Sequence, residues 1–322
     1  MKYTYNIIIP HKNTPKLLQR CLDSIPKRDD LLIIVVDDNS DSDKVDFEHF
    51  PGLDRDDVDV YFTKEGKGAG YARNVGLEHA DCKKVLFSDS DDYFNYCLNE
   101  ILDDYKYDET DIVFFNRLNV DSELYTYSNK RDSYGSFTKT YEKDPQKGED
   151  LFRYEFDGPV CKLIEKSLID KNNIRFEEVQ ILDDVYFSYM TGHNAKNIKV
   201  DKRAIYTVTY SPKSAMFTWN PEKLKTRIAV NCRRVLFLKE NNINVRAIHC
   251  LEWNLTNIKN QDIQLYKDCL KIISEHGLDA EYYRKQTDNL IMKKIKEERR
   301  INRLNIIRNL LNPIKTIIKA MA

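Results

Sequence analysis

The chain has little of what marks disulfide-bonded, zinc-binding or membrane-spanning proteins. Its seven cysteines are odd in number and widely scattered, with no Cys-x-x-Cys pair, so we expect reduced thiols in a cytosolic protein. No apolar run approaches the roughly 20 residues that span a bilayer, and residues 1–5 are not typical of a signal peptide. No internal repeat or low-complexity linker divides the chain. With 322 residues, it is long enough for one large domain with an appendage, or for two domains.

The net charge of −1 hides an asymmetry between the C-terminal tail and the rest. Residues 293–322 carry nine Lys or Arg against two Glu, a net of +7, so residues 1–292 sum to −8. Apolar residues recur every three or four positions from Leu304 to Met321, and we expect Pro313 to kink or split this helix. A basic amphipathic helix is typical of a membrane-surface anchor or a protein-docking segment, and a terminal helix packed on its own protein remains open. The acidic core and the apolar stripe argue against nucleic-acid binding.

The first 116 residues alternate between strand-like and helix-like segments. Pro10 should end the first strand, and Thr14 with Pro15 marks a helix start. Continuous apolar runs are typical of strands covered on both faces. The alternation predicts an α/β fold with a doubly wound, mostly parallel sheet. The predicted strands lie at residues 6–9, 31–36, 58–62, 84–88 and 112–115.

The regular alternation of strand-like and helix-like segments ends at residue 116. Residues 125–141 are polar, aromatic and alternating, which favours a hairpin or a flexible loop. Residues 181–187 read as a helix entered through two acids, a position that the helix dipole alone would favour. Residues 204–210 read as a strand, and everything from Pro221 onward looks helical. We therefore expect an α/β domain over 1–215, a helical region over 216–292 and the basic tail over 293–322.

Three acids follow the fourth predicted strand directly. Asp89, Asp91 and Asp92 come after the apolar run that ends at Phe87. Like charges repel, so acids massed at a strand end usually hold a hard cation through oxygen ligands. In an open α/β sheet, ligands bind at the carboxyl ends of the strands. A plain Asp-rich turn is the alternative.

Other strand ends carry polar groups that could line the same crevice. The first strand is followed by residues 10–13, and the second by Asp37 and Asp38, carboxylates that suit nucleobase or ribose donors. Residues 64–74 form a glycine-rich turn in which Lys67 and Arg73 offer positive charge to phosphate. This turn is neither a Rossmann fingerprint nor a P-loop. Acids beside phosphate-binding groups need a bridging Mg²⁺ or Mn²⁺, and a nucleotide sugar is the simplest substrate with a base, a ribose and a metal-bound diphosphate.

The chain resembles the family 2 glycosyltransferases with the GT-A fold, of the type found in bacterial polysaccharide biosynthesis. Matching segments occur in the family's order over about the first 116 residues, and later segments resemble the family's acceptor-side block. The early segments are residues 7–13, 21–25, 35–40, 68–77 and 87–92, and the later ones are 159–162, 174–177 and 182–185.

The resemblance implies roles for individual residues. Asp37 and Asp38 would contact the base and ribose, Pro10 would shape the nucleotide pocket, and Arg73 would lie near the diphosphate or its loop. Asp89 and Asp91 would match the Asp-x-Asp motif, with Asp91 as the direct metal ligand. Asp184 matches the catalytic base, although Asp183 stands where the family commonly has Glu. His11 stands in a segment altered from the family's pattern, which leaves its role open, and His193 reads as a surface or core residue rather than an extra metal ligand.

Such an enzyme would use Asp184 to deprotonate an acceptor hydroxyl and would invert the donor's configuration. The resemblance implies a glycan or lipid-linked acceptor in surface polysaccharide assembly, such as capsule, and the basic tail would suit a cytoplasmic protein held peripherally at the plasma membrane. A nucleotidyltransferase is the alternative enzyme, but its glycine-rich loop is missing after the first strand. The alternative that is not an enzyme is a catalytically inactive scaffold that binds sugar nucleotides at the membrane.

Overall fold

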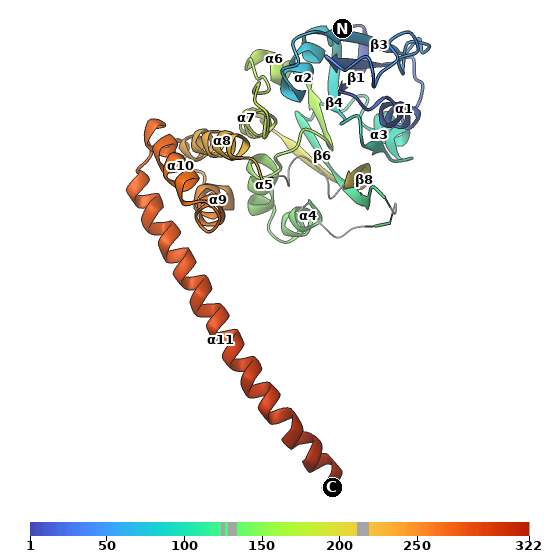
Figure 1. Cartoon of the computed structure of the whole chain (residues 1–322). Coiled ribbons are helices and arrows are strands. Elements are labelled where there is room, and N and C mark those ends of the chain that lie inside the picture. Colours follow the sequence, from blue (N-terminus) through green and yellow to red (C-terminus); the bar gives the residue numbers. More distant parts are fainter. Residues whose placement is uncertain (124–125, 128–133, 211–218, 322) are drawn as a thin grey trace. The chain divides into compact units, whose positions relative to one another are not determined.

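The computed structural model describes residues 1–123, 126–127, 134–210 and 219–321. The chain forms two compact units, Met1–Val230 and Asn231–Ala322. Their boundary falls inside a single helix, α8 (Pro221–Glu240), so no linker separates the units. Each unit is described below by itself (Figure 1).

The first unit is built on one sheet with the strand order β3-β2-β1-β4-β7-β6-β8-β5. Strand β7 is antiparallel to β4 and β6, and β5 is antiparallel to β8. The other neighbouring pairs are parallel, which confirms the mostly parallel, doubly wound sheet. The strands are β1 (Tyr3–His11), β2 (Leu31–Asp38), β3 (Val58–Thr63), β4 (Cys82–Phe87), β5 (Tyr93–Phe94), β6 (Ile112–Asp121), β7 (Lys162–Glu165) and β8 (Ile198–Tyr210).

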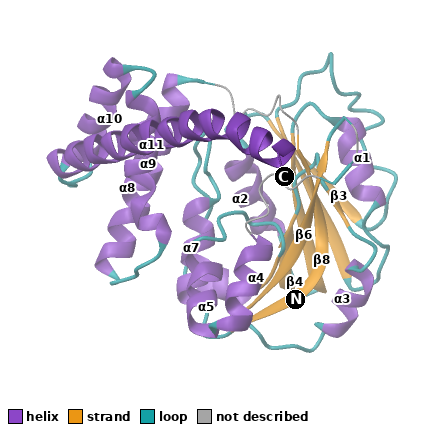
Figure 2. Cartoon of the chain, turned by 90° about the horizontal axis from the view of Figure 1, so that it is seen from below, coloured by secondary structure: helices purple, strands orange, loops and turns teal. Residues whose placement is uncertain are grey.

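Helices cover both faces of this sheet (Figure 2). Helices α1 (Pro15–Asp23) and α3 (Leu98–Asp104) lie on one face. The other face is covered by α2 (Ala69–His79), α4 (Tyr134–Lys143), α5 (Pro145–Tyr154) and α7 (Val185–Asn194). The short helix α6 (Lys166–Lys171) follows β7. Strands covered on both faces must be apolar throughout, and this explains the continuous apolar runs of the sequence.

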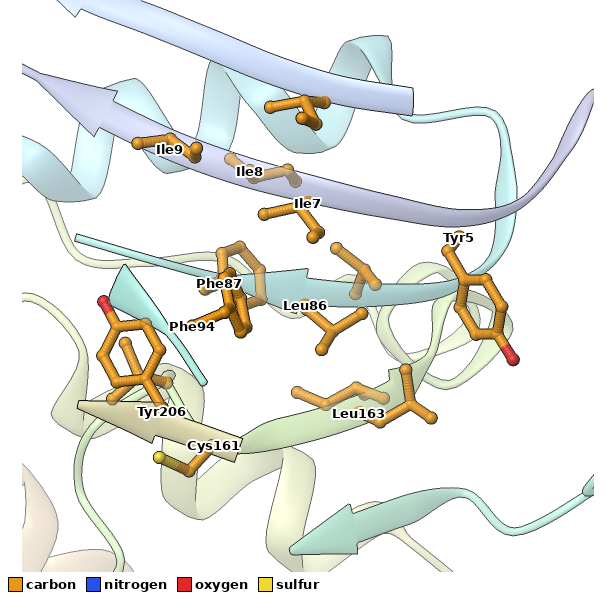
Figure 3. Packing of buried hydrophobic residues seen from close by; sticks show 14 of the residues in the cluster. Tyr5, Ile7, Ile8, Ile9, Leu86, Phe87, Phe94, Cys161, Leu163 and Tyr206 are labelled. Carbon is orange, nitrogen blue, oxygen red and sulfur yellow. The ribbon is translucent and has the colours of Figure 1, made fainter. Parts of the chain in front are cut away.

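The core of the sheet is closely packed (Figure 3). All eight residues of β2 are buried, and Ile7, Ile8 and Ile9 of β1 are 0% exposed. Each fully buried aliphatic side chain of this kind contributes about 1.5–3 kcal/mol. Such a core holds the strand ends in fixed positions, and the polar residues beyond those ends are therefore fixed as well.

Strand β1 lies at a topological switch point. The chain runs outward from β1 to β2 and β3, then returns to pair β4 with the other side of β1. Where strand order reverses in this way, the connections leave in opposite directions and a crevice opens outside the carboxyl ends. The carboxyl ends of β1, β2 and β4 are followed by the polar segments that the sequence singled out.

The prediction that Pro10 ends the first strand was wrong. Strand β1 continues through Pro10 to His11, with Pro10 in register with Val36. The β1–β4 ladder ends at Ile8, so β1 has a free side there, and a strand with a free side accommodates proline.

The segment 125–141 was expected to be a hairpin or a loop, yet α4 begins at Tyr134. Phe137 is 2% exposed, and Phe137 and Tyr141 each contact Phe152 edge-on, at ring-centroid distances of 6.0 and 6.1 Å. Tertiary packing of this aromatic face therefore decides the conformation. Residues 124–125 and 128–133 lie outside the described part of the chain.

The chain is helical from Pro221 onward, as predicted. The helices after α8 are η2 (Arg246–His249), α9 (Cys250–Lys259), α10 (Ile263–Glu275) and α11 (Ala280–Met321). The basic tail is the continuation of α11 rather than a separate helix. Pro313 was expected to kink or split the tail helix, but α11 continues through it from Ala280 to Met321. In the described part of the chain, no helix is long and apolar enough to cross a membrane.

Candidate active site

The acids after β4 form a tight turn, here called the acid turn (residues 89–92). The N–H of Asp92 donates to the carbonyl of Asp89 at 3.1 Å and closes it. Asp91 is exposed and Asp89 partly so, whereas Asp92 is 3% exposed. Asp92 accepts a hydrogen bond from the N–H of Thr209 at 2.7 Å. Burial raises the pKa of Asp92 well above its usual value, and Asp91 and Asp89 add to this. Asp92 therefore faces inward, and Asp89 and Asp91 carry the outward-facing charge.

The end of β2 is tied to the end of β1 through His11. The N–H of Thr14 donates to His11 Nε2 at 3.0 Å, and His11 Nδ1 lies 2.7 Å from Asp37 Oδ2. Because Nε2 accepts a hydrogen bond, it carries no hydrogen of its own, so Nδ1 carries the ring hydrogen and donates it to Asp37. Ser40 also donates to Asp37, from its N–H at 2.9 Å and its hydroxyl at 2.5 Å. Burial raises the pKa of Asp37, but hydrogen bonds from His11 and Ser40 outweigh it and leave the pKa low.

Asp38 is placed differently from Asp37. Its Oδ2 accepts the N–H of Gly68 at 2.8 Å, and the ammonium of Lys12 lies 3.7 Å away. Its Oδ1 is buried and has no hydrogen-bond partner among the described residues. A buried acceptor without a partner costs about 1–3 kcal/mol. Asp38 is therefore suited to receive a donor from a ligand.

Gly70 lets α2 approach the segment before α7. A Cβ on Gly70 would lie 2.2 Å from the carbonyl oxygen of Glu177 and 3.0 Å from Cβ of Asp183. No side chain fits in that space. The segment is closed on itself by the N–H of Glu177, which donates to the carbonyl of Asp183 at 3.0 Å. The close approach brings Arg73, one turn along α2, to the acids that precede α7.

Arg73 joins the two acidic parts of the site. One guanidinium nitrogen donates to Asp183 Oδ2 at 2.6 Å, and another donates to Asp89 Oδ1 at 2.6 Å. Burial works against the charge of Arg73, but Asp89, Asp183 and Asp184 outweigh it and raise its pKa. The Arg73 Nε atom is buried without a hydrogen-bond partner among the described residues. The prediction placed Arg73 near a diphosphate or its loop, and in this structure its bonded nitrogens are committed to carboxylates.

Asp184 is the N-cap residue of α7, but its side chain makes no capping hydrogen bond. A capping role therefore does not account for it. Burial and the neighbouring charge of Asp183 together raise the pKa of Asp184 to about 7, against the opposing effect of Arg73. Leu182, just before the pair, has a φ of 58°, a left-handed conformation that costs a non-glycine residue on the order of 1 kcal/mol. Strained backbone and a perturbed carboxyl together are typical of a functional position.

The structure thus brings most of the predicted site residues to one edge of the sheet. Pro10, Asp37 and Asp38 lie at the ends of β1 and β2, Asp89 follows β4, and Arg73 links Asp89 to the pair before α7. His193 is not among them. It lies near the far end of α7, about 13 Å along the helix from Asp184, with its Nδ1 3.2 Å from the hydroxyl of Tyr154.

Sequence reasoning missed the residues that support the site from behind. Arg20 of α1 donates to the carbonyl of Asp91, and the hydroxyl of Tyr206 accepts from the N–H of Asp89 at 2.8 Å. Neither residue stands in a motif, so no signal in the sequence could have pointed to them.

The oxygen donors fit Mg²⁺ or Mn²⁺ only in part. Asp91 is exposed, and Arg73 bonds only one of the two oxygens of Asp89. Two carboxylates therefore face outward, and carboxylate oxygens are the hard ligands that these ions prefer. Among the described residues, no group of three or more His, Cys, Asp or Glu side chains could hold a metal ion. An ion here would need further oxygens from a ligand, which is how Mg²⁺ is commonly bound beside substrate phosphates.

Comparison with known proteins decides the family. The sequence profile described as "Glycosyl transferase family 2" matches residues 6–171, more than half of the chain. The chain belongs to this family. The match includes most of β1, all of β2 and the acid turn, and it ends before Asp183 and Asp184.

Curated relatives of this family 2 chain are bacterial proteins named as glycosyltransferases. EpsH of Bacillus subtilis (strain 168), provisionally named a glycosyltransferase, is 26% identical over 250 residues, which cover 74% of this chain and 70% of EpsH. The poly(ribitol-phosphate) β-N-acetylglucosaminyltransferase TarS of Staphylococcus aureus (strain Mu50 / ATCC 700699) is 34% identical over 96 residues, only 28% of this chain and 17% of TarS. These relatives support a glycosyltransferase in polysaccharide assembly.

Solved structures share the fold. A crystal structure of S. aureus TarS 1-349 in complex with UDP-GlcNAc has a TM-score of 0.59 at 21% identity, and the match covers 88% of each chain. The mannosyltransferase PcManGT from Pyrobaculum calidifontis, in complex with GDP-Man and Mn²⁺, has a TM-score of 0.55 at 14% identity, covering 91% of this chain and 81% of that one. Both likenesses confirm a GT-A-like α/β fold.

Proposed function

We propose that the chain is an inverting, metal-dependent glycosyltransferase. It moves a sugar from a nucleoside-diphosphate donor to a hydroxyl of a glycan or lipid-linked acceptor in surface polysaccharide assembly. The observation that carries the proposal is the double ion pair of Arg73. The guanidinium of Arg73 binds Asp89 of the acid turn through one nitrogen and Asp183, the neighbour of Asp184, through another, and so holds the two acidic parts of the site together. A transferase needs this arrangement, because the group that holds the diphosphate and the group that activates the acceptor must flank the same carbon.

Asp38 is the residue proposed to bind the nucleoside. Its buried Oδ1 lacks a partner among the described residues and can accept a hydrogen bond from a base N–H or a ribose hydroxyl. Asp37 has both oxygens occupied by His11 and Ser40, so it acts by holding the loop between β1 and α1. Pro10, buried in β1 beside His11, shapes the same wall. A nucleoside-diphosphate donor is further supported by the UDP-GlcNAc and GDP-Man bound to the two structural relatives.

Asp184 is proposed as the general base. It takes the proton of the acceptor hydroxyl while the oxygen attacks the anomeric carbon from the side opposite the leaving diphosphate. Direct displacement of this kind inverts the configuration. A pKa of about 7 suits the role, because a base works best when its pKa lies near the working pH. Burial also raises the pKa of Asp183, and the charge of Arg73 opposes that rise, so Arg73 sets the electrostatic environment of the base.

Asp91, with Asp89, is the proposed site for Mg²⁺ or Mn²⁺, whose charge would offset that of the departing diphosphate. The Mn²⁺ bound to PcManGT together with GDP-Man supports this assignment.

The basic C-terminal part of α11 is proposed to hold the protein peripherally at an anionic membrane surface, where a lipid-linked acceptor would lie. Ile301 and Leu304 on this helix are 50% and 54% exposed among the lysines and arginines of the segment. Exposed apolar side chains flanked by cations favour the interface between water and an anionic bilayer. Flotation with anionic vesicles tests this: deletion of residues 293–322 should abolish binding, and equal binding of the truncated protein would exclude the anchor.

The experiment that tests the enzymatic proposal is calorimetric titration with UDP, GDP, dTDP and CDP, each with Mn²⁺ and with chelator. We expect one nucleotide to bind only with Mn²⁺. Asp184→Asn should then bind that nucleotide as the wild type does, and should fail to transfer sugar from the matching donor. Binding without any transfer by the wild type would favour the inactive scaffold. Release of diphosphate from a nucleoside triphosphate and a sugar phosphate would indicate the nucleotidyltransferase.

A further inference from the structure

The acid turn is held from behind by β8. Tyr206 lies in the core, 0% exposed, with its ring 5.2 Å from that of Phe94 in an edge-on contact (Figure 3). Its hydroxyl is 2.8 Å from the N–H of Asp89, which donates to it, and 3.0 Å from the hydroxyl of Ser88. Tyr206 therefore contacts the first peptide of the acid turn at the point where β4 ends.

Two more contacts secure the rest of the turn. The N–H of Thr209, three residues beyond Tyr206 on β8, donates to Asp92 Oδ1 at 2.7 Å. Arg20 donates to the carbonyl of Asp91, and from the same nitrogen to the Thr209 hydroxyl at 3.2 Å. Three of the four residues of the turn are thus held by groups from α1 and β8. None of these contacts uses the carboxylates of Asp89 and Asp91, which stay available on the outer side.

Such support matters because the acid turn is electrostatically unfavourable. Three carboxylates within four residues repel one another, and the turn would open to separate them if its backbone were free. Ligands of a metal must also keep their positions to within about half an ångström. Groups that orient the ligating side chains are therefore as necessary as the ligands themselves.

We propose that Tyr206 and Arg20 are positioning residues, which hold the acid turn in the one geometry that binds the metal and the donor diphosphate. This inference rests on the proposed function of the site. Neither residue contacts the reacting atoms, and each acts through the backbone of the turn. The specific consequence is that removing the Tyr206 hydroxyl weakens metal-dependent nucleotide binding while the protein stays folded.

The chain offers a matched control in Tyr5. Its side chain is also 0% exposed, and its hydroxyl also makes a buried hydrogen bond, to the carbonyl of Leu102 at 2.6 Å, but it has no contact with the acid turn. Tyr206→Phe and Tyr5→Phe each remove one buried hydroxyl and keep the ring. Tyr206→Phe should lower the melting temperature more, because its hydroxyl has two hydrogen-bond partners and that of Tyr5 has one, so binding is compared well below both melting temperatures. Arg20→Gln is a second variant on the other side of the turn, in case Tyr206→Phe folds poorly.

The measurement is calorimetric titration of the full chain with Mn²⁺ and the nucleoside diphosphate that binds the wild type, alongside the electron paramagnetic resonance spectrum of Mn²⁺. Tyr206→Phe and Arg20→Gln should weaken Mn²⁺-dependent binding by about 10–100-fold, the usual effect of removing an outer-shell partner, and should broaden the spectrum. Tyr5→Phe should change neither.

The outcomes separate the two proposals. If the wild type binds and all three variants bind equally well, the positioning role is wrong and the proposed function stands. If Tyr5→Phe weakens binding as much as Tyr206→Phe, the effect is one of general stability and the positioning role is again wrong. If the wild type binds no nucleoside diphosphate with Mn²⁺, the proposed function fails, and the positioning role fails with it.

Discussion

Replacement of Asp184 by Asn should remove a carboxylate that the folded protein holds at an energetic cost. Burial raises the pKa of Asp184 to about 7, whereas an aspartate in an unfolded chain titrates near 3.9. Between these values the folded state keeps a proton that the unfolded state has released, so the unfolding free energy falls as the pH rises from about 4 to about 7. Above pH 7 both states are ionised and the loss is complete.

The size of the effect follows from the shift. One pKa unit corresponds to about 1.4 kcal/mol, so a shift of about three units gives up to about 4 kcal/mol, shared with the coupled groups Asp183 and Arg73. Asp184→Asn has no charge to desolvate. Relative to the wild type it should therefore gain stability between pH 4 and pH 7 and keep a constant advantage above pH 7, although it cannot transfer sugar.

Scanning calorimetry with chelator between pH 4.5 and 8.5 measures this difference, at about 2–4 °C of melting temperature per kcal/mol for a unit of this size. Asp37→Asn is the control with the opposite sign. Hydrogen bonds lower the pKa of Asp37 below its usual value despite burial, so its stabilisation is present above pH 4 and Asp37→Asn should be less stable than the wild type at neutral pH. A difference between Asp184→Asn and the wild type that stays constant across this range would refute the reasoning.

Three further substitutions test single contacts. Gly70→Ala would place a Cβ 2.2 Å from the carbonyl oxygen of Glu177, and we expect a loss of about 1–3 kcal/mol in unfolding free energy, measured by denaturant titration; an unchanged value would show that this segment can move. Arg73→Gln leaves two carboxylates without their cation and should cost about 3–5 kcal/mol, and full stability would mean that the ion pairs do not form in solution. His11→Leu removes the bridge to Asp37 and should weaken nucleotide binding by calorimetry, and wild-type affinity would exclude a positioning role for the imidazole.

The sheet was predictable because its signal is local. Strands buried on both faces must be apolar along their whole length, so β1, β2 and β4 stand out as runs of Ile, Val and Leu. The acids that follow them could be assigned to one edge, because parallel strands of a doubly wound sheet end there. The prediction failed at Pro10, because whether a strand can continue through a proline depends on whether the neighbouring strand is still hydrogen-bonded to it there. In this sheet the β1–β4 ladder has already ended at Ile8.

The pairing of Arg73 with Asp183 was not predictable from the sequence. These residues lie 110 positions apart, and no periodicity or spacing connects them. Their contact depends on Gly70, whose missing side chain matters only because the carbonyl of Glu177 lies where a Cβ would be. The same holds for α4, where packing against Phe152 decides a conformation that the polar, alternating sequence did not indicate.

The carboxylates of the site differ in how far the protein itself satisfies them, and this difference separates structural from ligand-binding roles. Both oxygens of Asp37 accept hydrogen bonds, so its charge is used within the fold. Asp91 reaches the surface, yet partial burial and the charge of Asp89 raise the pKa of its carboxyl to about 6, and the contacts from α1 and β8 hold the acid turn through backbone groups and Asp92. Without metal, Asp91→Asn should therefore not lower the melting temperature and should raise it at neutral pH, because one of three repelling charges is removed. It should abolish Mn²⁺-dependent nucleotide binding, whereas Asp37→Asn should lower both the melting temperature and the binding. Loss of stability in Asp91→Asn, measured without metal, would show that the turn needs this charge for folding, and the assignment of Asp91 to the metal would then lose its basis.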